Sequence, residues 1–154
     1  MRSAPSLQAI RPANILLVDD NAHGLVARRN VLEALGYQVV SASCASEALQ
    51  LTAERGFDLI VTDYRMPAMD GVALIAELRE RKFVNPIILL SGFLTHLGLT
   101  EESTGADLLI QKCAHETDYL IRGVKKLLSA PVRKKPVGSQ TRLKAKTKKA
   151  SSDS

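Results

Sequence analysis

The sequence predicts an α/β fold, a doubly wound five-stranded parallel sheet with helices on both of its faces. Between residues 14 and 129, five short apolar runs alternate with segments whose apolar residues recur at helical spacing. The runs are continuously apolar and are bounded by turn-forming residues, which is typical of strands covered on both faces. Strict alternation of strands and helices favours parallel pairing through helical crossovers.

The predicted strands are six or seven residues long. They are NILLVDD (14–20), YQVVSA (37–42), FDLIVTD (57–63), PIILLSG (86–92) and DLLIQK (107–112).

The predicted helices occupy the segments between and after these strands. The first covers residues 25–36 and ends at Gly36; the second covers 45–56, with Ser46 as N-cap and Gly56 as its end. Two more helices are predicted over 71–82 and 115–128. The segment 93–105 carries the weakest helical pattern, because Gly98 interrupts it and its apolar stripe is thin.

The charge of the chain is concentrated at its C-terminal end. Residues 131–154 hold eight basic side chains and one acidic one, a net charge of +7, whereas residues 1–130, with 13 basic and 15 acidic side chains, carry −2. Few large apolar residues occur in 131–154, so we expect a disordered tail. The predicted organisation is an N-terminal extension (1–13), one folded domain (14–130) and the basic tail (131–154).

Composition excludes several other classes of protein. The longest apolar runs are far too short to span a bilayer and no secretory signal is visible, so we expect a cytoplasmic protein without a membrane span. No glycine-rich nucleotide-binding motif occurs, and the DDNAH stretch lacks the D-x-D pattern of aspartate-nucleophile phosphatases. No metal-ligand spacing relates the cysteines and histidines, which are Cys44, Cys113, His23, His96 and His115.

Polar residues follow four of the five predicted strands. In a doubly wound sheet, functional groups gather beyond the carboxyl ends of the strands. Each residue alone has a structural explanation as a cap, turn or surface residue, but together they would place three carboxylates, a hydroxyl and an ammonium group in one cleft. The residues are Asp19, Asp20, Asp63, Ser91 and Lys112.

This set of residues favours phosphoryl transfer to a carboxylate. Three neighbouring carboxylates repel one another unless a cation lies among them, and Mg²⁺ suits oxygen ligands. Asp63, which stands alone on a central strand, is then the expected nucleophile toward phosphorus, with Asp19 and Asp20 as a metal seat. Lys112 and Ser91 offer a positive charge and a hydroxyl donor to the phosphoryl oxygens.

Four motifs, LLVDD, VTDYRMPAMDG, LLSG and GADLLIQK, occur in this order, and over roughly residues 14–129 the chain resembles the receiver domain of two-component response regulators. The resemblance implies a flavodoxin-like (βα)5 sheet of strand order 2-1-3-4-5. It implies that Asp63 takes a phosphoryl group from a phosphohistidine on a sensor histidine kinase or a histidine phosphotransfer protein. The protein would promote its own phosphorylation and dephosphorylation without being a turnover enzyme.

The resemblance also implies a role for each residue of the site. Asp20, Asp63 and the backbone carbonyl of Arg65 would bind Mg²⁺ directly, and Asp19 would assist through water. Ser91 and Lys112 would contact the phosphoryl group.

Three features depart from the family pattern or vary within it. Cys113 follows Lys112 where the family usually has proline, and Leu109 stands where an aromatic switch residue is usual. Phe93 and Arg65 occupy positions that in this family affect access of the hydrolytic water. We expect the bulky Phe93 to slow dephosphorylation.

Three interpretations of function stay open at this point. The first is a stand-alone phospho-accepting receiver that signals to a downstream effector or relays the phosphoryl group, with homodimerisation possible. The second is a receiver that gates weak nucleic-acid binding by residues 131–154. The third, suggested by Leu109 and Cys113, is a pseudo-receiver that serves only as an interaction module.

Overall fold

The computed structural model describes residues 11–129. The strands are β1 (Asn14–Val18), β2 (Gln38–Ala42), β3 (Leu59–Asp63), β4 (Ile87–Ser91) and β5 (Leu108–Gln111). The helices are α2 (Ala22–Ala34), α3 (Ala45–Glu54), α4 (Gly71–Glu80), α5 (Leu94–Leu97), α6 (Glu101–Thr104) and α7 (Glu116–Ser129). The predicted basic tail (131–154) and most of the N-terminal extension lie outside the described residues.

The five strands form one parallel sheet in the order β2-β1-β3-β4-β5, which confirms the predicted fold class and strand order. The register pairs Val18 with Thr62 and Asp63 with Leu90. The carboxyl ends of β1, β3 and β4 are therefore nearly level, and the residues that follow them meet at one edge of the sheet.

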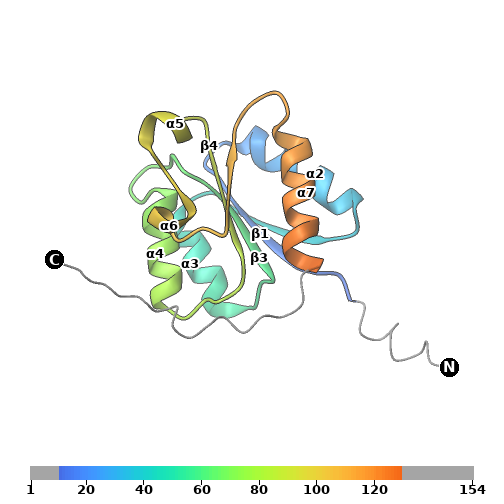
Figure 1. The fold of residues 1–154 in the computed structure, drawn as a ribbon. Coiled ribbons are helices and arrows are strands. Elements are labelled where there is room, and N and C mark those ends of the chain that lie inside the picture. The colour runs from blue at the N-terminus through green and yellow to red at the C-terminus, as the bar shows by residue number, and fades with distance from the viewer. Residues whose placement is uncertain (1–10, 130–154) are drawn as a thin grey trace.

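Two apolar layers hold the helices on the sheet, one on each face. Figure 1 shows α2 and α7 on one side of the strands and α3, α4 and α6 on the other. Along β1, Leu16 belongs to the layer that contains α3 and α4, whereas Leu17 belongs to the layer that contains α2 and α7. Ile60 and Val61 divide in the same way on β3, so the central strands are buried on both faces, as their unbroken apolar runs predict.

The ends of two helices differ from the prediction. The first helix begins at Ala22 rather than at residue 25, because the Asn21 side chain accepts the Gly24 N–H and caps a first turn that has no apolar stripe. Ser46 is wrong as an N-cap, since α3 already begins at Ala45 and Cys44 makes no side-chain cap there. The Glu47 carboxylate instead accepts the backbone N–H of Ser43, which precedes Cys44, and so satisfies a backbone donor just ahead of the helix.

The segment 93–105 contains two single-turn helices, α5 and α6, instead of one helix. Gly98 and Gly105 follow them with φ of +63° and +81°, in the left-handed region that favours glycine. The interruption at Gly98 is therefore confirmed. Among residues 11–129, no helix is both long and apolar enough to cross a membrane.

Candidate functional site

A cleft lies at the carboxyl edge of the sheet, where the predicted polar residues come together. It is lined by Asp19 and Asp20 after β1, Asp63 at the end of β3, Ser91 at the end of β4 and Lys112 after β5. The strands carry these side chains to one edge because all five strands are parallel.

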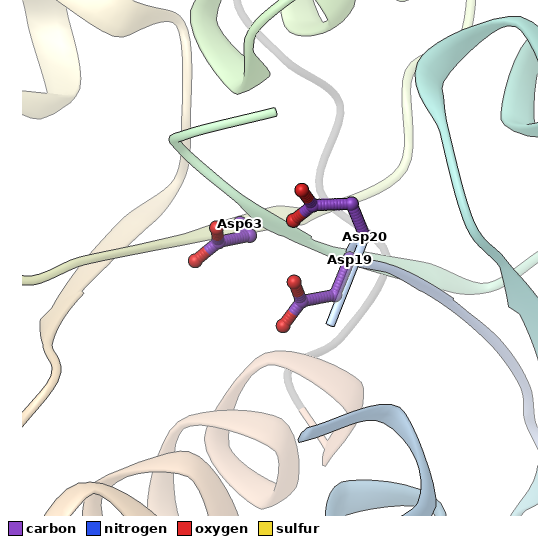
Figure 2. Close-up of side chains that lie close together, drawn as sticks. All are labelled: Asp19, Asp20 and Asp63. Atoms are coloured by element: carbon purple, nitrogen blue, oxygen red, sulfur yellow. The ribbon is translucent and has the colours of Figure 1, made fainter. Parts of the chain in front are cut away.

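Three carboxylates form the acidic centre of this cleft. Asp19, Asp20 and Asp63 can each present one oxygen so that these oxygens all lie within 4.8 Å of one another. Figure 2 shows Asp19 and Asp20 side by side at the end of one strand, facing Asp63 on the neighbouring strand. Asp19 and Asp63 are buried, at 2% and 4% exposure, whereas Asp20 is exposed to solvent.

The electrostatics of Asp63 are those of a buried charge with one direct partner. Burial raises the pKa of the Asp63 carboxyl above its usual range; the hydrogen bond from Lys112 opposes this rise, and the neighbouring Asp19 carboxylate adds to it. The Lys112 ammonium Nζ contacts Asp63 Oδ1 directly. With Cys113 in place of the usual proline, Lys112 therefore still reaches the carboxylate.

Ser91 is the last residue of β4, which lies between β3 and β5, and it therefore stands between Asp63 and Lys112. Its hydroxyl oxygen accepts the Phe93 N–H at 3.0 Å, and its backbone carbonyl accepts the Lys112 N–H at 2.9 Å. A hydroxyl that accepts one hydrogen bond still has its own O–H to donate. The Ser91 O–H is therefore available to an oxygen in the cleft.

The loop between β3 and α4 shapes one wall of the cleft. The Gly71 N–H donates to the Tyr64 carbonyl at 2.7 Å, which closes the loop. Within it, Ala68 has φ of +69° and the Met69 N–H donates to the Pro67 carbonyl at 2.7 Å, a three-residue turn that is strained for a residue with a side chain.

Two side chains stack at the mouth of the cleft. The guanidinium carbon of Arg65 lies 4.7 Å from the centre of the Phe93 ring, and both residues line the cleft. Phe93 is 46% exposed, so solvent reaches its side chain. This pair lines the cleft that holds Asp63, and the sequence prediction did not include the stacking.

A partly buried ion-pair chain behind the acidic centre was also missed. Arg28 on α2 contacts Asp19 with one nitrogen and Glu116 at the start of α7 with another, each at 2.7 Å. The available signal was that Arg28 falls on the apolar stripe of its helix, between Leu25 and Leu32. A charged residue on the buried face of a helix usually has an ionic partner.

The donor set of the cleft fits a hard divalent cation. All the converging side-chain groups of the acidic centre are carboxylate oxygens, and Mg²⁺ takes oxygen ligands with only one or two direct carboxylates. Two buried carboxylates and one exposed carboxylate at this spacing repel one another, which a bound dication would relieve. Arg65 lines the same cleft, while the role of its carbonyl stays a prediction.

This parallel sheet, with an acidic centre, a hydroxyl and a lysine at its carboxyl edge, defines the class of receiver-like α/β domains. The family model described as the response regulator receiver domain matches residues 15–122. The chain belongs to the response regulator receiver domain family, and is a receiver domain of the two-component type.

Curated relatives match the chain over about half of its length. The transcriptional regulatory protein GlrR of Escherichia coli is 37% identical over 81 residues, which are 53% of this chain and 18% of that protein. The alkaline phosphatase synthesis transcriptional regulatory protein PhoP of Bacillus subtilis is 38% identical over 77 residues, 50% of this chain and 32% of that protein. The match therefore spans less than a third of the length of either relative.

Solved structures match over most of the described domain. The chemotaxis protein CheY4 of Vibrio cholerae superposes with a TM-score of 0.69 at 26% identity, covering 77% of this chain and all of that one. The response regulator TrrA of Thermotoga maritima, solved in complex with Mg(2+)-BeF, superposes with a TM-score of 0.67 at 31% identity, covering 75% and 99% of the two chains.

Proposed function

We propose that this receiver accepts a phosphoryl group on Asp63 in a Mg²⁺-dependent reaction. The observation that carries the proposal is the setting of Asp63. It is a buried carboxylate that shares a cleft with Asp19 and Asp20 and is contacted by the Lys112 ammonium. The similarity to a receiver solved with Mg(2+)-BeF supports the same conclusion.

The reaction that this setting supports is an in-line transfer from a phosphohistidine. An Asp63 carboxylate oxygen attacks phosphorus, a P–O bond forms, and the P–N bond to the donor imidazole breaks. The imidazole leaves with the electron pair of that bond and takes up a proton. The product is an aspartyl phosphate on Asp63.

The remaining residues of the cleft would hold the cation and the phosphoryl oxygens. Asp20, Asp63 and the Arg65 carbonyl would hold Mg²⁺, with Asp19 acting through water, and the ion would neutralise charge on the transferring group. The Lys112 ammonium and the Ser91 O–H would each stabilise a phosphoryl oxygen.

The partners that we propose follow from this chemistry. The donor is a sensor histidine kinase or a histidine phosphotransfer protein, and the phosphorylated receiver binds a downstream effector or passes the phosphoryl group on. We place this exchange in the cytoplasm and regard the chain as a signalling protein without enzymatic turnover. Homodimerisation, stand-alone action and nucleic-acid binding by residues 131–154 stay predictions.

The pseudo-receiver alternative is less well supported than phospho-acceptance. It was suggested by Leu109 and Cys113, which depart from the family pattern. The groups that phospho-acceptance requires are nevertheless all in place, with three converging carboxylates and the Lys112 ammonium in contact with Asp63.

Intact-mass measurement after incubation with acetyl phosphate and Mg²⁺ tests the proposal. We expect the wild-type chain to gain the mass of one phosphoryl group, and Asp63→Asn to gain none, because an amide cannot replace the carboxylate as nucleophile. Chelation of Mg²⁺ should abolish the gain.

Asp118→Asn provides the matched control for this experiment. Asp118 is an exposed acid in the first turn of α7, away from the cleft, and its variant should gain mass as the wild type does. A wild type that stays unmodified, or a gain that survives Asp63→Asn, would remove Asp63 as the acceptor.

Phe93→Ala should shorten the lifetime of the phosphorylated protein severalfold. The ring of Phe93, with Arg65 stacked on it, lines the cleft that holds Asp63, so its removal should open a wider path for the hydrolytic water. The measurement is the decay of the phosphorylated mass after the donor is removed. Leu97→Ala, which removes another exposed apolar side chain outside the cleft, should leave the lifetime unchanged; equal lifetimes for all three chains would contradict the prediction.

A further inference from the structure

The ion-pair chain behind the acidic centre places a second, permanent cation beside the proposed metal site. Arg28 Nη1 lies 2.7 Å from Asp19 Oδ2, and Arg28 Nε lies 2.7 Å from Glu116 Oε2. The Arg28 side chain is only 13% exposed, so solvent screens its charge weakly. A guanidinium keeps its proton under all ordinary conditions.

Gly24 gives Arg28 the space that this position requires. A Cβ on Gly24 would lie 3.0 Å from Arg28 Nη1 and 3.1 Å from Asp19 Oδ2, tighter than most real contacts of such an atom. Glycine inside a helix costs about 1 kcal/mol relative to alanine. The helix thus contains an unfavourable residue one turn before Arg28, at the point where a side chain would press on the ion pair.

The charges around the cleft set up a competition for the acidic centre. Lys112 contacts Asp63 and Arg28 contacts Asp19, so two of the three carboxylates already have a cationic partner. Glu116 partly offsets the charge of Arg28 from the other side. A dication that enters the cleft is attracted by the carboxylates and repelled by the guanidinium.

We propose that Arg28 is an internal counter-cation that lowers the affinity of the acidic centre for Mg²⁺, and that Glu116 limits this effect by pairing with it. The inference rests on the proposed function, because it concerns the same metal site. It makes Arg28 a residue that tunes the site through Asp19 without touching the phosphoryl group.

Opposite changes in Mg²⁺ affinity are expected from substitutions at Arg28 and at Glu116. Arg28→Gln removes the competing charge and should tighten Mg²⁺ binding about tenfold. Glu116→Gln leaves Arg28 without its second partner and should weaken binding about threefold. Arg28→Lys keeps the charge and should stay within about twofold of the wild type.

The experiment is a titration of the full chain with MgCl₂, followed by amide NMR shifts of residues around Asp63, which measures the metal affinity without any phosphodonor. The exposed pair formed by Arg29 and Glu33 on the outer face of α2 supplies the matched controls. Arg29→Gln and Glu33→Gln make the same changes of charge away from the cleft and should leave the affinity unchanged. Circular dichroism of each variant reports whether it is folded.

The outcomes separate this inference from the proposed function. Shifts of the same sign for Arg28→Gln and Glu116→Gln, or no shift in either, would mean that the chain is only structural and would overturn the inference. If Arg28→Gln does not fold, the comparison of Glu116→Gln with Glu33→Gln still tests the inference. Weaker Mg²⁺ binding by Glu116→Gln supports it, and equal binding overturns it. If the wild type binds Mg²⁺ and gains phosphoryl mass, but the Arg28 and Glu116 variants bind Mg²⁺ as the wild type does, only the inference is refuted. If the wild type binds no Mg²⁺, the inference and the proposed function are both refuted.

Discussion

Replacement of Gly71 by alanine should lower the free energy of unfolding by about 3 kcal/mol, which is the size expected for a forced clash in a close-packed core. A Cβ on Gly71 would lie 2.4 Å from the Asp63 carbonyl oxygen and 2.8 Å from Leu89 Cδ1. The Tyr64 Cα would be 3.0 Å away. Two of these three atoms are backbone, so no side-chain rotation can relieve the overlap.

The same substitution should also impair phosphorylation of the fraction that stays folded. The backbone that the new methyl group would displace belongs to Asp63 itself, and the Gly71 N–H closes the loop on Tyr64. Movement of this backbone would re-aim the acceptor carboxylate, and small misplacements of a reacting group are costly.

Urea unfolding followed by circular dichroism measures the loss of stability, and Gly56→Ala is its matched control. Gly56 has no atom within 4 Å of an added Cβ and no positive φ, so its alanine variant should lie within about 0.5 kcal/mol of the wild type. If Gly71→Ala and Gly56→Ala are equally stable, the backbone around Gly71 can move aside for a methyl group, and the prediction is wrong.

Much of the fold could be predicted because its central strands are buried on both faces. The run 57–63 contains β3 (Leu59–Asp63), and every residue of that strand is buried, so its unbroken apolar run located it. The helix ends were harder to predict, since caps depend on local hydrogen bonds. Asn21 caps α2 one turn earlier than predicted, and near the start of α3 the side chain that accepts a backbone N–H is Glu47, which bonds to Ser43, rather than Ser46.

The membership of the cleft followed from strand ends, while its surroundings depended on tertiary contacts. A parallel sheet brings the ends of its strands to one edge, so Asp63 and Lys112 could be expected to meet. Arg28 and Glu116 are 88 residues apart, and no local pattern pairs them. The apolar stripe showed that Arg28 was on a buried face, but it did not identify Asp19 and Glu116 as its partners.

Lys112→Met should slow phosphorylation of Asp63 by acetyl phosphate about 100-fold or more, the loss usual when one preorganised donor to developing charge is removed. In the ground state the Lys112 ammonium contacts the acceptor carboxylate directly. Methionine keeps much of the length of the side chain but has no charge. Lys125→Met, on the exposed face of α7, is the matched control and should react at the wild-type rate.

Two further measurements on Lys112→Met separate a loss of charge at the phosphoryl group from other causes. The hydrogen bond from Lys112 lowers the pKa of Asp63, so its loss should raise that pKa and leave more of the carboxyl protonated at a given pH. If protonation alone slowed the reaction, the rate would recover as the pH is raised through the new pKa, whereas a missing partner for the phosphoryl oxygens leaves the rate low. Mg²⁺ affinity should not fall, because a competing cation has been removed and the carboxylates of Asp19 and Asp20 remain. A full recovery of the phosphorylation rate at high pH would therefore mean that Lys112 serves only to keep Asp63 ionised.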